Sequence, residues 1–108
     1  MVRPHRFEVW WCSLDPTVGH EIAKAGPVVV VSPDEANDVV PWFIVAPIIT
    51  GQLPYASRIP TQFDGRPAVI VVDQLRCVDR GRLSRRMGVL DPDAQVRLLQ
   101  ALAAFFAP

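Results

Sequence analysis

The sequence predicts a mainly β fold, an antiparallel sheet or small barrel with a helix packed against it. Two observations support this: several short apolar runs are separated by proline and glycine, and one long segment without a helix breaker closes the chain. The chain has 108 residues, half of them apolar, which is the size of one domain (residues 1–108) with a genuine core.

The strands are expected where β-branched and aromatic residues gather. Phe7 to Leu14 is rich in both, and Val28 to Val31 is a run of four valines, typical of a strand buried on both faces. Three further strands are expected at Trp42 to Ile48, Ser57 to Thr61 and Ala68 to Val72. Whether the last continues through "DQLRCV" stays open.

The connections and the helix follow from local signals. Residues 15–27 contain proline and glycine and predict a long exposed loop. Ser32 and Pro33 are placed to cap and to begin a short helical turn. Asp91 and Pro92 are a strong helix start, and no breaker follows until Pro108.

The C-terminal helix is apolar over much of its circumference. Leu98, Leu102 and Phe105 fall on one stripe, whereas Leu99 and Phe106 lie off it. Such a helix usually needs cover on two sides, one from its own sheet and the other from a partner subunit.

Charge and cysteine content exclude several classes of protein. The formal net charge is zero, and no apolar run approaches the roughly 20 residues that cross a bilayer, so we expect a cytoplasmic protein without membrane contact. Cys12 and Cys77 match no metal or redox spacing and are expected to be buried, inert thiols, although a disulfide between them stays open.

The order of local motifs resembles the MazF/PemK family of toxins. The motifs are "VWWCSLDPTVGHE", "GPVVVVSPDEAN", "FIVAPIIT" and "VDQLRCVDRGRLSRRMGVLD", followed by an amphipathic helix. The resemblance implies an SH3-like barrel with a C-terminal helix (α+β, mainly β) and a homodimer. It also implies a metal-independent, sequence-selective endoribonuclease of single-stranded RNA that needs no cofactor and is inhibited by a cognate antitoxin protein. CcdB-type toxins share the fold but poison DNA gyrase.

The same resemblance implies particular site residues. The loop from Asp15 to Pro27 corresponds to the loop that borders the RNA groove, and Glu21 matches an acidic residue in it. The family's catalytic threonine is matched by Thr50. The catalytic arginine directly before the proline is replaced by Gly26. Natural divergence, an inactive homologue and an engineered change all remain compatible with this glycine.

Two loop residues are candidates to replace the missing arginine. In an extended segment Lys24 would point to the same side as Gly26 and reach a phosphate, and His20 has the intrinsic pKa for proton transfer. The alternative is that both are solvated loop residues. For Thr50, the alternative is a β-branched residue that merely ends a strand.

Further candidates concern RNA binding. Thr17, His20, Lys24 and Gln74 are the expected RNA contacts, and the pair Asp73 and Gln74 is expected to hold strand and loop around the groove.

Arginines and tryptophans have competing interpretations. The five arginines of "RCVDRGRLSRR" either contact RNA or an acidic antitoxin, or form the solvated face of a short helix capped by Asp79. The tryptophans either stack on bases or belong to the core. Adjacent Trp10 and Trp11 must face opposite sides of their strand.

Overall fold

The computed structural model describes residues 3–50 and 58–108, and seven strands in these residues form one antiparallel sheet. The strand order is β4-β5-β3-β2-β1-β7, and β6 pairs with β3 beside this path. The strands are β1 (Glu8–Ser13), β2 (Ala25–Val30), β3 (Trp42–Thr50), β4 (Arg58–Phe63), β5 (Arg66–Val71), β6 (Arg76–Asp79) and β7 (Leu83–Val89). The helical elements are α1 (Asp34–Asn37), α2 (Pro92–Phe106) and the 3₁₀ turns η1 (Val72–Gln74) and η2 (Arg80–Arg82).

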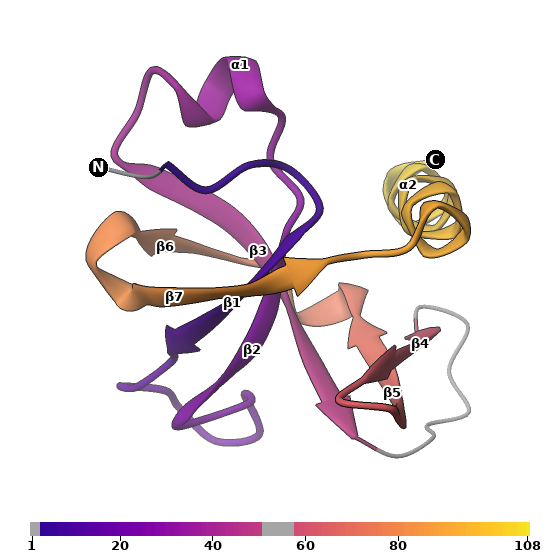
Figure 1. Ribbon diagram of the computed structural model, residues 1–108, viewed down its shortest axis with the longest axis horizontal. Coiled ribbons are helices and arrows are strands. Elements are labelled where there is room, and N and C mark those ends of the chain that lie inside the picture. Colours follow the sequence, from indigo (N-terminus) through magenta and orange to yellow (C-terminus); the bar gives the residue numbers. More distant parts are fainter. Residues whose placement is uncertain (1–2, 51–57) are drawn as a thin grey trace.

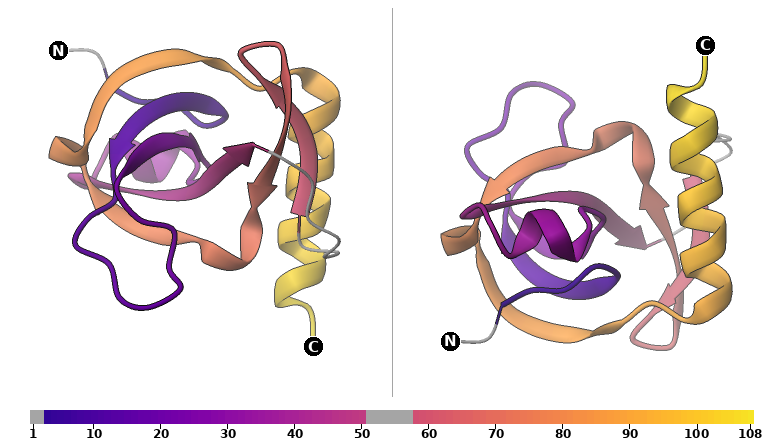
Figure 2. Two further views of the ribbon diagram at one scale, coloured as in Figure 1. Left: turned by 90° about the horizontal axis from the view of Figure 1, so that it is seen from below. Right: turned by 90° about the horizontal axis from the view of Figure 1, so that it is seen from above.

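Strand β3 is the strand around which the sheet curls. Its first half pairs with β6 and its last three residues, Ile48 to Thr50, pair with β5, while β2 pairs with its middle. Because partners change along this one strand, the sheet bends around it into a half-barrel (Figure 1). Helix α2 lies along one side of the curled sheet, beside β4 (Figure 2). The expected mainly β fold with a C-terminal helix is confirmed.

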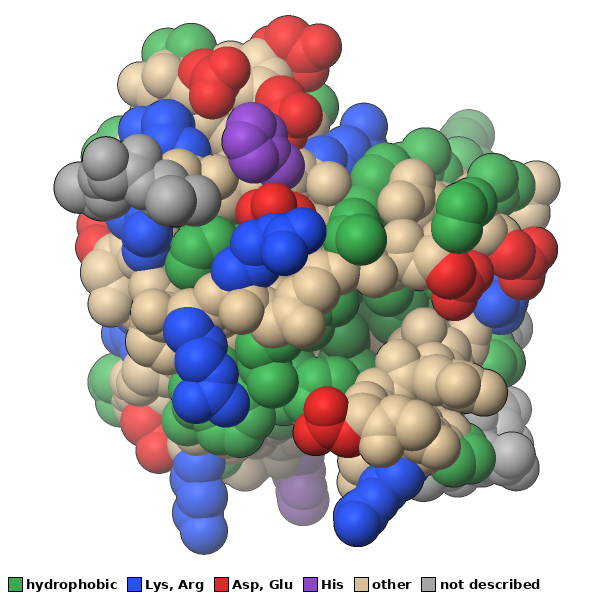
Figure 3. Space-filling model, viewed as in Figure 1, with side chains coloured by type: hydrophobic (Ala, Val, Ile, Leu, Met, Phe, Trp, Pro, Cys, Tyr) green, Lys and Arg blue, Asp and Glu red, His purple; other side chains and the backbone are tan. Residues whose placement is uncertain are grey.

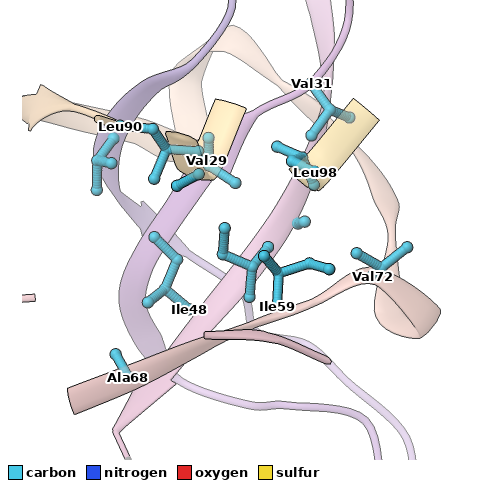
Figure 4. Packing of buried hydrophobic residues seen from close by; sticks show 12 residues of the cluster. Val29, Val31, Ile48, Ile59, Ala68, Val72, Leu90 and Leu98 are labelled. Carbon is cyan, nitrogen blue, oxygen red and sulfur yellow. The ribbon is translucent and has the colours of Figure 1, made fainter. Parts of the chain in front are cut away.

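The valines of β2 face two separate cores. Val29 and Val31 pack into a cluster with Leu98 of α2 (Figure 4). Val28 and Val30 pack on the opposite face with Phe43 and residues of β1, β6 and β7. Since successive side chains of a strand alternate between faces, the run of valines is explained by burial on both sides, as predicted.

Helix α2 is capped and half covered. The Asp91 carboxylate accepts a hydrogen bond from the Ala94 N–H at 2.8 Å, and Pro92 stands in the first turn. Leu98 is fully buried, but Phe105 and Phe106 are 48% and 68% exposed. The outer face is therefore apolar and open, and Phe105 contributes less to the buried stripe than predicted. In the described part of the chain, no helix has the length and apolarity to cross a membrane.

Two local predictions were wrong. Strand β2 begins at Ala25, so Gly26 and Pro27 lie in the strand and not in the loop. Ser32 does not cap α1; its hydroxyl donates to Asn37 Oδ1 at 2.6 Å, and Pro33 is the N-cap. The continuation through "DQLRCV", which the sequence left open, is interrupted by η1, so that β5 and β6 are separate strands.

The remaining boundaries agree closely with expectation. The strand expected from Ser57 begins at Arg58, and Ser57 itself lies outside the described residues. Both cysteines are free thiols, which excludes a disulfide between them. Cys12 is buried as expected, whereas Cys77 is exposed because it alternates with buried Val78 on β6 and so projects from the opposite face of that strand.

Candidate functional site

The loop between β1 and β2 is closed at its base. The Leu14 N–H donates to the Lys24 carbonyl at 2.6 Å, directly beyond the last strand pair, Ser13 and Ala25. Within the loop, the Val18 N–H donates to Glu21 Oε1 at 2.6 Å. These hydrogen bonds give the main chain of the loop a defined conformation, although most of its side chains are exposed.

Long-range hydrogen bonds from residues 74–82 hold this loop against the sheet. Gln74 Oε1 accepts from the Ile22 N–H at 2.7 Å. Arg76 donates to the Leu14 carbonyl at 2.7 Å, and Arg82 donates to the carbonyls of Ser13 and Asp15. We call Gln74, Arg76 and Arg82 the loop anchors. They fix both ends of the loop, so Gln74 does hold strand and loop together.

Arg80 and Asp79 of the arginine run are also engaged by contacts within the fold. Arg80 donates to the Leu83 carbonyl at 2.8 Å and lies over the Trp10 ring, 5.1 Å from its centroid. Asp79 caps the 3₁₀ turn η2 by accepting from the Gly81 N–H at 2.7 Å. The predicted short helix amounts to this single turn, flanked by β6 and β7.

A groove of about 310 Å³ opens where the loop, the middle strands and the β4–β5 hairpin meet. Its lining comprises Trp11, Leu14, Ile22, Ala23, Ala25, Gly26, Pro27, Pro47, Ile48, Ile49, Thr50 and Phe63. Among the described lining residues, Thr50 is the one that carries a hydroxyl group. Figure 3 shows hydrophobic side chains in the recessed part of this face, with basic side chains around its margin.

Gly26 and Thr50 come together in this groove. Gly26 pairs with Cys12 on β1. A Cβ built on Gly26 would have no heavy atom within 4 Å outside the two residues next to it in the chain. Thr50 is exposed at the end of β3, opposite Ala68 of β5. The two positions come from strands that pair with one another, and position 26 has room for a side chain.

The other candidates lie outside the groove. Lys24 has a left-handed backbone with φ of 67°, is exposed and is absent from the lining. The prediction that Lys24 and Gly26 share one side assumed an extended segment and is therefore wrong. His20 is exposed on the loop, and the Thr17 hydroxyl donates to Asp15 Oδ1 at 3.3 Å.

Glu21 and Gln74 line a second, smaller hollow. It measures about 210 Å³ and also includes Asp73 and Arg76. The structure therefore divides the predicted site residues into a groove pair, a pair in the second hollow, and exposed loop residues.

The two adjacent tryptophans face opposite sides of β1, as predicted. Trp10 is buried and its indole N–H donates to Glu8 Oε1 at 3.0 Å. Trp11 is half-buried and lines the groove, opposite Pro27 of β2. Sequence reasoning missed Phe63 of β4, because only the folding of the hairpin brings that strand to the groove. Trp42 is 49% exposed and lies elsewhere, at the start of β3.

Glu8 is a buried carboxylate at the other end of β1. Burial alone would raise the pKa of Glu8, but hydrogen bonds from the His5 N–H, the Trp10 indole and the Arg86 guanidinium together lower it. The Arg86 Nε lies 2.8 Å from Glu8 Oε2. This carboxylate is held ionised by the fold and lies outside the groove lining. Burial raises the pKa of the Cys12 thiol, which argues for an inert thiol.

Within residues 3–50 and 58–108, no group of three or more His, Cys, Asp or Glu side chains is arranged to hold a metal ion.

Comparison with known proteins identifies the family of this chain. Residues 5–106 match the family described as PemK-like, MazF-like toxin of type II toxin–antitoxin system. The chain belongs to this toxin family.

Individual relatives agree with the family assignment. The chain is 32% identical over 105 residues to the endoribonuclease EndoA of Bacillus subtilis, covering 90% of this chain and 89% of that protein. Its fold matches MazF of Deinococcus radiodurans with a TM-score of 0.85 at 21% identity, over 97% of each chain. It also matches a mycobacterial endoribonuclease in complex with its cognate antitoxin, with a TM-score of 0.79 at 18% identity, over 94% and 92% of the two chains. The MazF-like architecture expected from the motifs is confirmed.

Proposed function

We propose that this PemK/MazF-like toxin cleaves single-stranded RNA, including mRNA, in the groove that contains Gly26 and Thr50. It acts in the cytoplasm without a metal ion, by attack of a ribose 2′-hydroxyl on the adjacent phosphate. The observation that carries the proposal is the meeting of these two positions in one groove beside the anchored loop. The kinship with an endoribonuclease supports the reaction class.

This reaction requires a base for the 2′ proton, an acid for the leaving 5′ oxygen, and donors that stabilise the charged phosphorane. The Thr50 hydroxyl is suited to donate a hydrogen bond to a phosphate oxygen in the groove. Glu21 and His20 are the proposed proton-transfer groups, and Thr17, Lys24 and Gln74 the proposed contacts to the rest of the RNA. The Glu21 and Gln74 side chains each accept a hydrogen bond from a main-chain N–H of the loop. Their use in the reaction therefore requires the loop to change conformation.

Gly26 sets the level of activity in this proposal. An arginine grips two phosphate oxygens at once, whereas glycine offers only its backbone N–H. A Cβ at position 26 would meet no neighbour within 4 Å, so the backbone there accepts a residue with a side chain. We therefore expect Gly26→Arg to raise the cleavage rate by about 10²-fold, the usual effect of one oxyanion donor.

The test measures cleavage of a mixed-sequence single-stranded RNA by the wild-type chain, Gly26→Arg and Gly26→Gln. The glutamine variant adds a side chain of similar reach without the charge and should not gain activity. Thr50→Ala should reduce cleavage, and Thr61→Ala on β4 is its matched control. If neither the wild-type chain nor Gly26→Arg binds or cuts RNA, the proposal is wrong.

The almost entirely apolar lining favours a second candidate, a protein-binding toxin that acts like CcdB on gyrase. An apolar groove suits a peptide or protein side chain better than a phosphate. Inhibition of DNA supercoiling, with no RNA cleavage by Gly26→Arg, would favour this candidate over the ribonuclease.

We further propose that the protein is a homodimer bound by a small antitoxin with a disordered, acidic tail. The apolar outer face of α2, with Val96, Leu99, Phe105 and Phe106 exposed, supports a partner subunit there. Sedimentation of the wild-type chain and of Phe106→Glu tests this: the wild-type chain should be dimeric and the variant monomeric.

A further inference from the structure

Among the residues whose side chains the structure describes, none that lines the groove is a lysine or an arginine. Gly26 contributes no side chain to the groove. A single-stranded RNA carries one negative charge per nucleotide, and its binding depends on cations near its path. If RNA occupies this groove, the positive charge that binds it must come from residues around the edge of the groove.

Most arginines are already committed to the fold. The loop anchors Arg76 and Arg82 donate to main-chain carbonyls, Arg86 pairs with buried Glu8, and Arg97 pairs with Asp93. The remaining committed residues are Arg3, Arg6 and Arg80, each of which donates to a main-chain carbonyl.

Among the lysines and arginines whose side chains the structure describes, three form no hydrogen bond or ion pair with another described residue: Lys24, Arg66 and Arg85. Arg66 belongs to the tip of the β4–β5 hairpin, and Lys24 is directed by its left-handed backbone out of the strand. Arg85 differs from both because it packs on a residue of the groove wall. Its guanidinium carbon lies 5.6 Å from the centroid of the Trp11 ring.

The strand register explains this placement. Trp11 is paired with Pro27 on one side and with Arg85 on the other, so the three residues form a row across β2, β1 and β7. Directly paired residues of an antiparallel sheet project from the same face. Pro27 and Trp11 line the groove, and Arg85 is the next residue in the row. The neighbouring Arg86 is paired with Trp10 and is engaged by Glu8.

We propose that Arg85 and Trp11 form an RNA-binding rim for the groove, in which Arg85 contacts a backbone phosphate and Trp11 stacks on the adjoining base. The inference rests on the proposed ribonuclease function and names a cation for the groove, whose described lining residues include neither lysine nor arginine. The guanidinium lies over the aromatic face, which leaves its N–H donors available to phosphate oxygens while the ring shields its apolar side. Arg85 is thus a binding residue on β7, at a distance in sequence from the expected arginine position.

The experiment uses a short 2′-O-methyl RNA, which cannot attack its own phosphates, so that binding is measured without cleavage. Binding of this labelled RNA is titrated at several salt concentrations with the wild-type chain, Arg85→Gln, Arg85→Lys and Arg66→Gln. We expect Arg85→Gln to weaken binding about tenfold at low salt and to reduce the slope of log K against log salt by about 0.7, the value for one phosphate on a single strand. Arg85→Lys should restore most of the slope, and Arg66→Gln should match the wild type.

A second readout locates the contact on Trp11. A Trp42→Phe background retains buried Trp10 and half-buried Trp11. In it RNA should quench part of the fluorescence, Trp11→Phe should abolish that quenching, and Arg85→Gln should change the emission of the free protein. Because the Arg85 side chain is exposed and forms no hydrogen bond with a described residue, the thermal unfolding midpoint of Arg85→Gln should equal that of the wild type.

The outcomes distinguish a failure of the role of Arg85 from a failure of the proposed ribonuclease function. RNA binding that keeps its affinity and salt slope in Arg85→Gln overturns the role of Arg85 and leaves the proposed function in place. Absence of RNA binding by the wild-type chain and by Gly26→Arg overturns both.

Discussion

The loop from Asp15 to Lys24 and the strand β2 that follows it are neighbours in the chain but are held in place by different interactions. Strand β2 is fixed by its own side chains, since alternate valines enter the two cores. The loop places few side chains in a core, and its main chain is fixed by the anchors Gln74, Arg76 and Arg82. The position of the strand is therefore fixed by its own apolar residues, whereas that of the loop depends on three polar side chains that are distant in the sequence.

The sharpest way to test this contrast is to place one charge in each region. Val30→Asp puts a carboxylate into a fully buried position and should destabilise the protein by about 4 kcal/mol, a large part of the stability of a typical domain. Val18→Asp, at a position 80% exposed on the loop, should change stability by no more than about 0.5 kcal/mol. Urea unfolding of both variants checks the pair, and equal losses would contradict the contrast.

Removing an anchor should affect the loop more than the fold. Arg82→Ala leaves the carbonyls of Ser13 and Asp15 without their donor, and we expect a loss of about 1 kcal/mol in global stability. Limited proteolysis between residues 15 and 24 should become several-fold faster, because the loop opens locally. Arg66→Ala is the control and should leave that cleavage rate unchanged; a loop that stays protected in Arg82→Ala would show that the anchors are dispensable.

The opposite end of β1 should make stability depend on pH through Glu8. Since the pKa of Glu8 is lowered in the folded state, its ionised form stabilises the fold above its ordinary pKa, and this stabilisation is lost as pH falls through the folded value. Glu8→Gln should therefore lose less stability than the wild type on acidification below about pH 4.5. Unfolding midpoints of the two chains between neutral and acidic pH measure the difference, and parallel curves would contradict it.

The smallest expected effect concerns the junction of the two regions. Lys24 has a positive φ, which costs a side-chain-bearing residue about 1 kcal/mol that glycine avoids. Lys24→Gly should therefore keep or slightly raise stability despite the greater freedom of glycine in the unfolded chain. Ala25→Gly, one residue later in β2, should lower stability by about 0.5–1 kcal/mol. Thermal unfolding of both variants distinguishes the junction from the strand.

The groove pair was predictable by resemblance, but its surroundings were not. Gly26 and Thr50 were identified by matching short motifs, and the structure brings them into one groove. The direction of the Lys24 side chain was misjudged, because the left-handed backbone at this residue, and not the alternation of a strand, sets it. The role of His20 was left open. Phe63 and Arg85 reach the groove region through strand pairings that no local pattern encodes.

The arginine run between residues 76 and 86 shows the same limit. Five arginines in eleven residues suggested either a nucleic-acid surface or a solvated helix. The structure assigns the side chains one by one: Arg76 and Arg82 to the loop, Arg80 and Arg86 to β7 and Glu8, and Arg85 to the face of Trp11. Composition could not separate them, because two β-bulge irregularities between β1 and β7 set which side chain faces which way.

The sequence by itself determined the strands, the capped C-terminal helix and the loop that precedes the valines, because periodicity, punctuation and capping residues act over a few neighbours. The tertiary structure alone decided which arginines hold the loop, which tryptophan faces the groove, and that the space at Gly26 is open. These features depend on the register of paired strands and on contacts between residues more than fifty positions apart, which local chemistry does not specify.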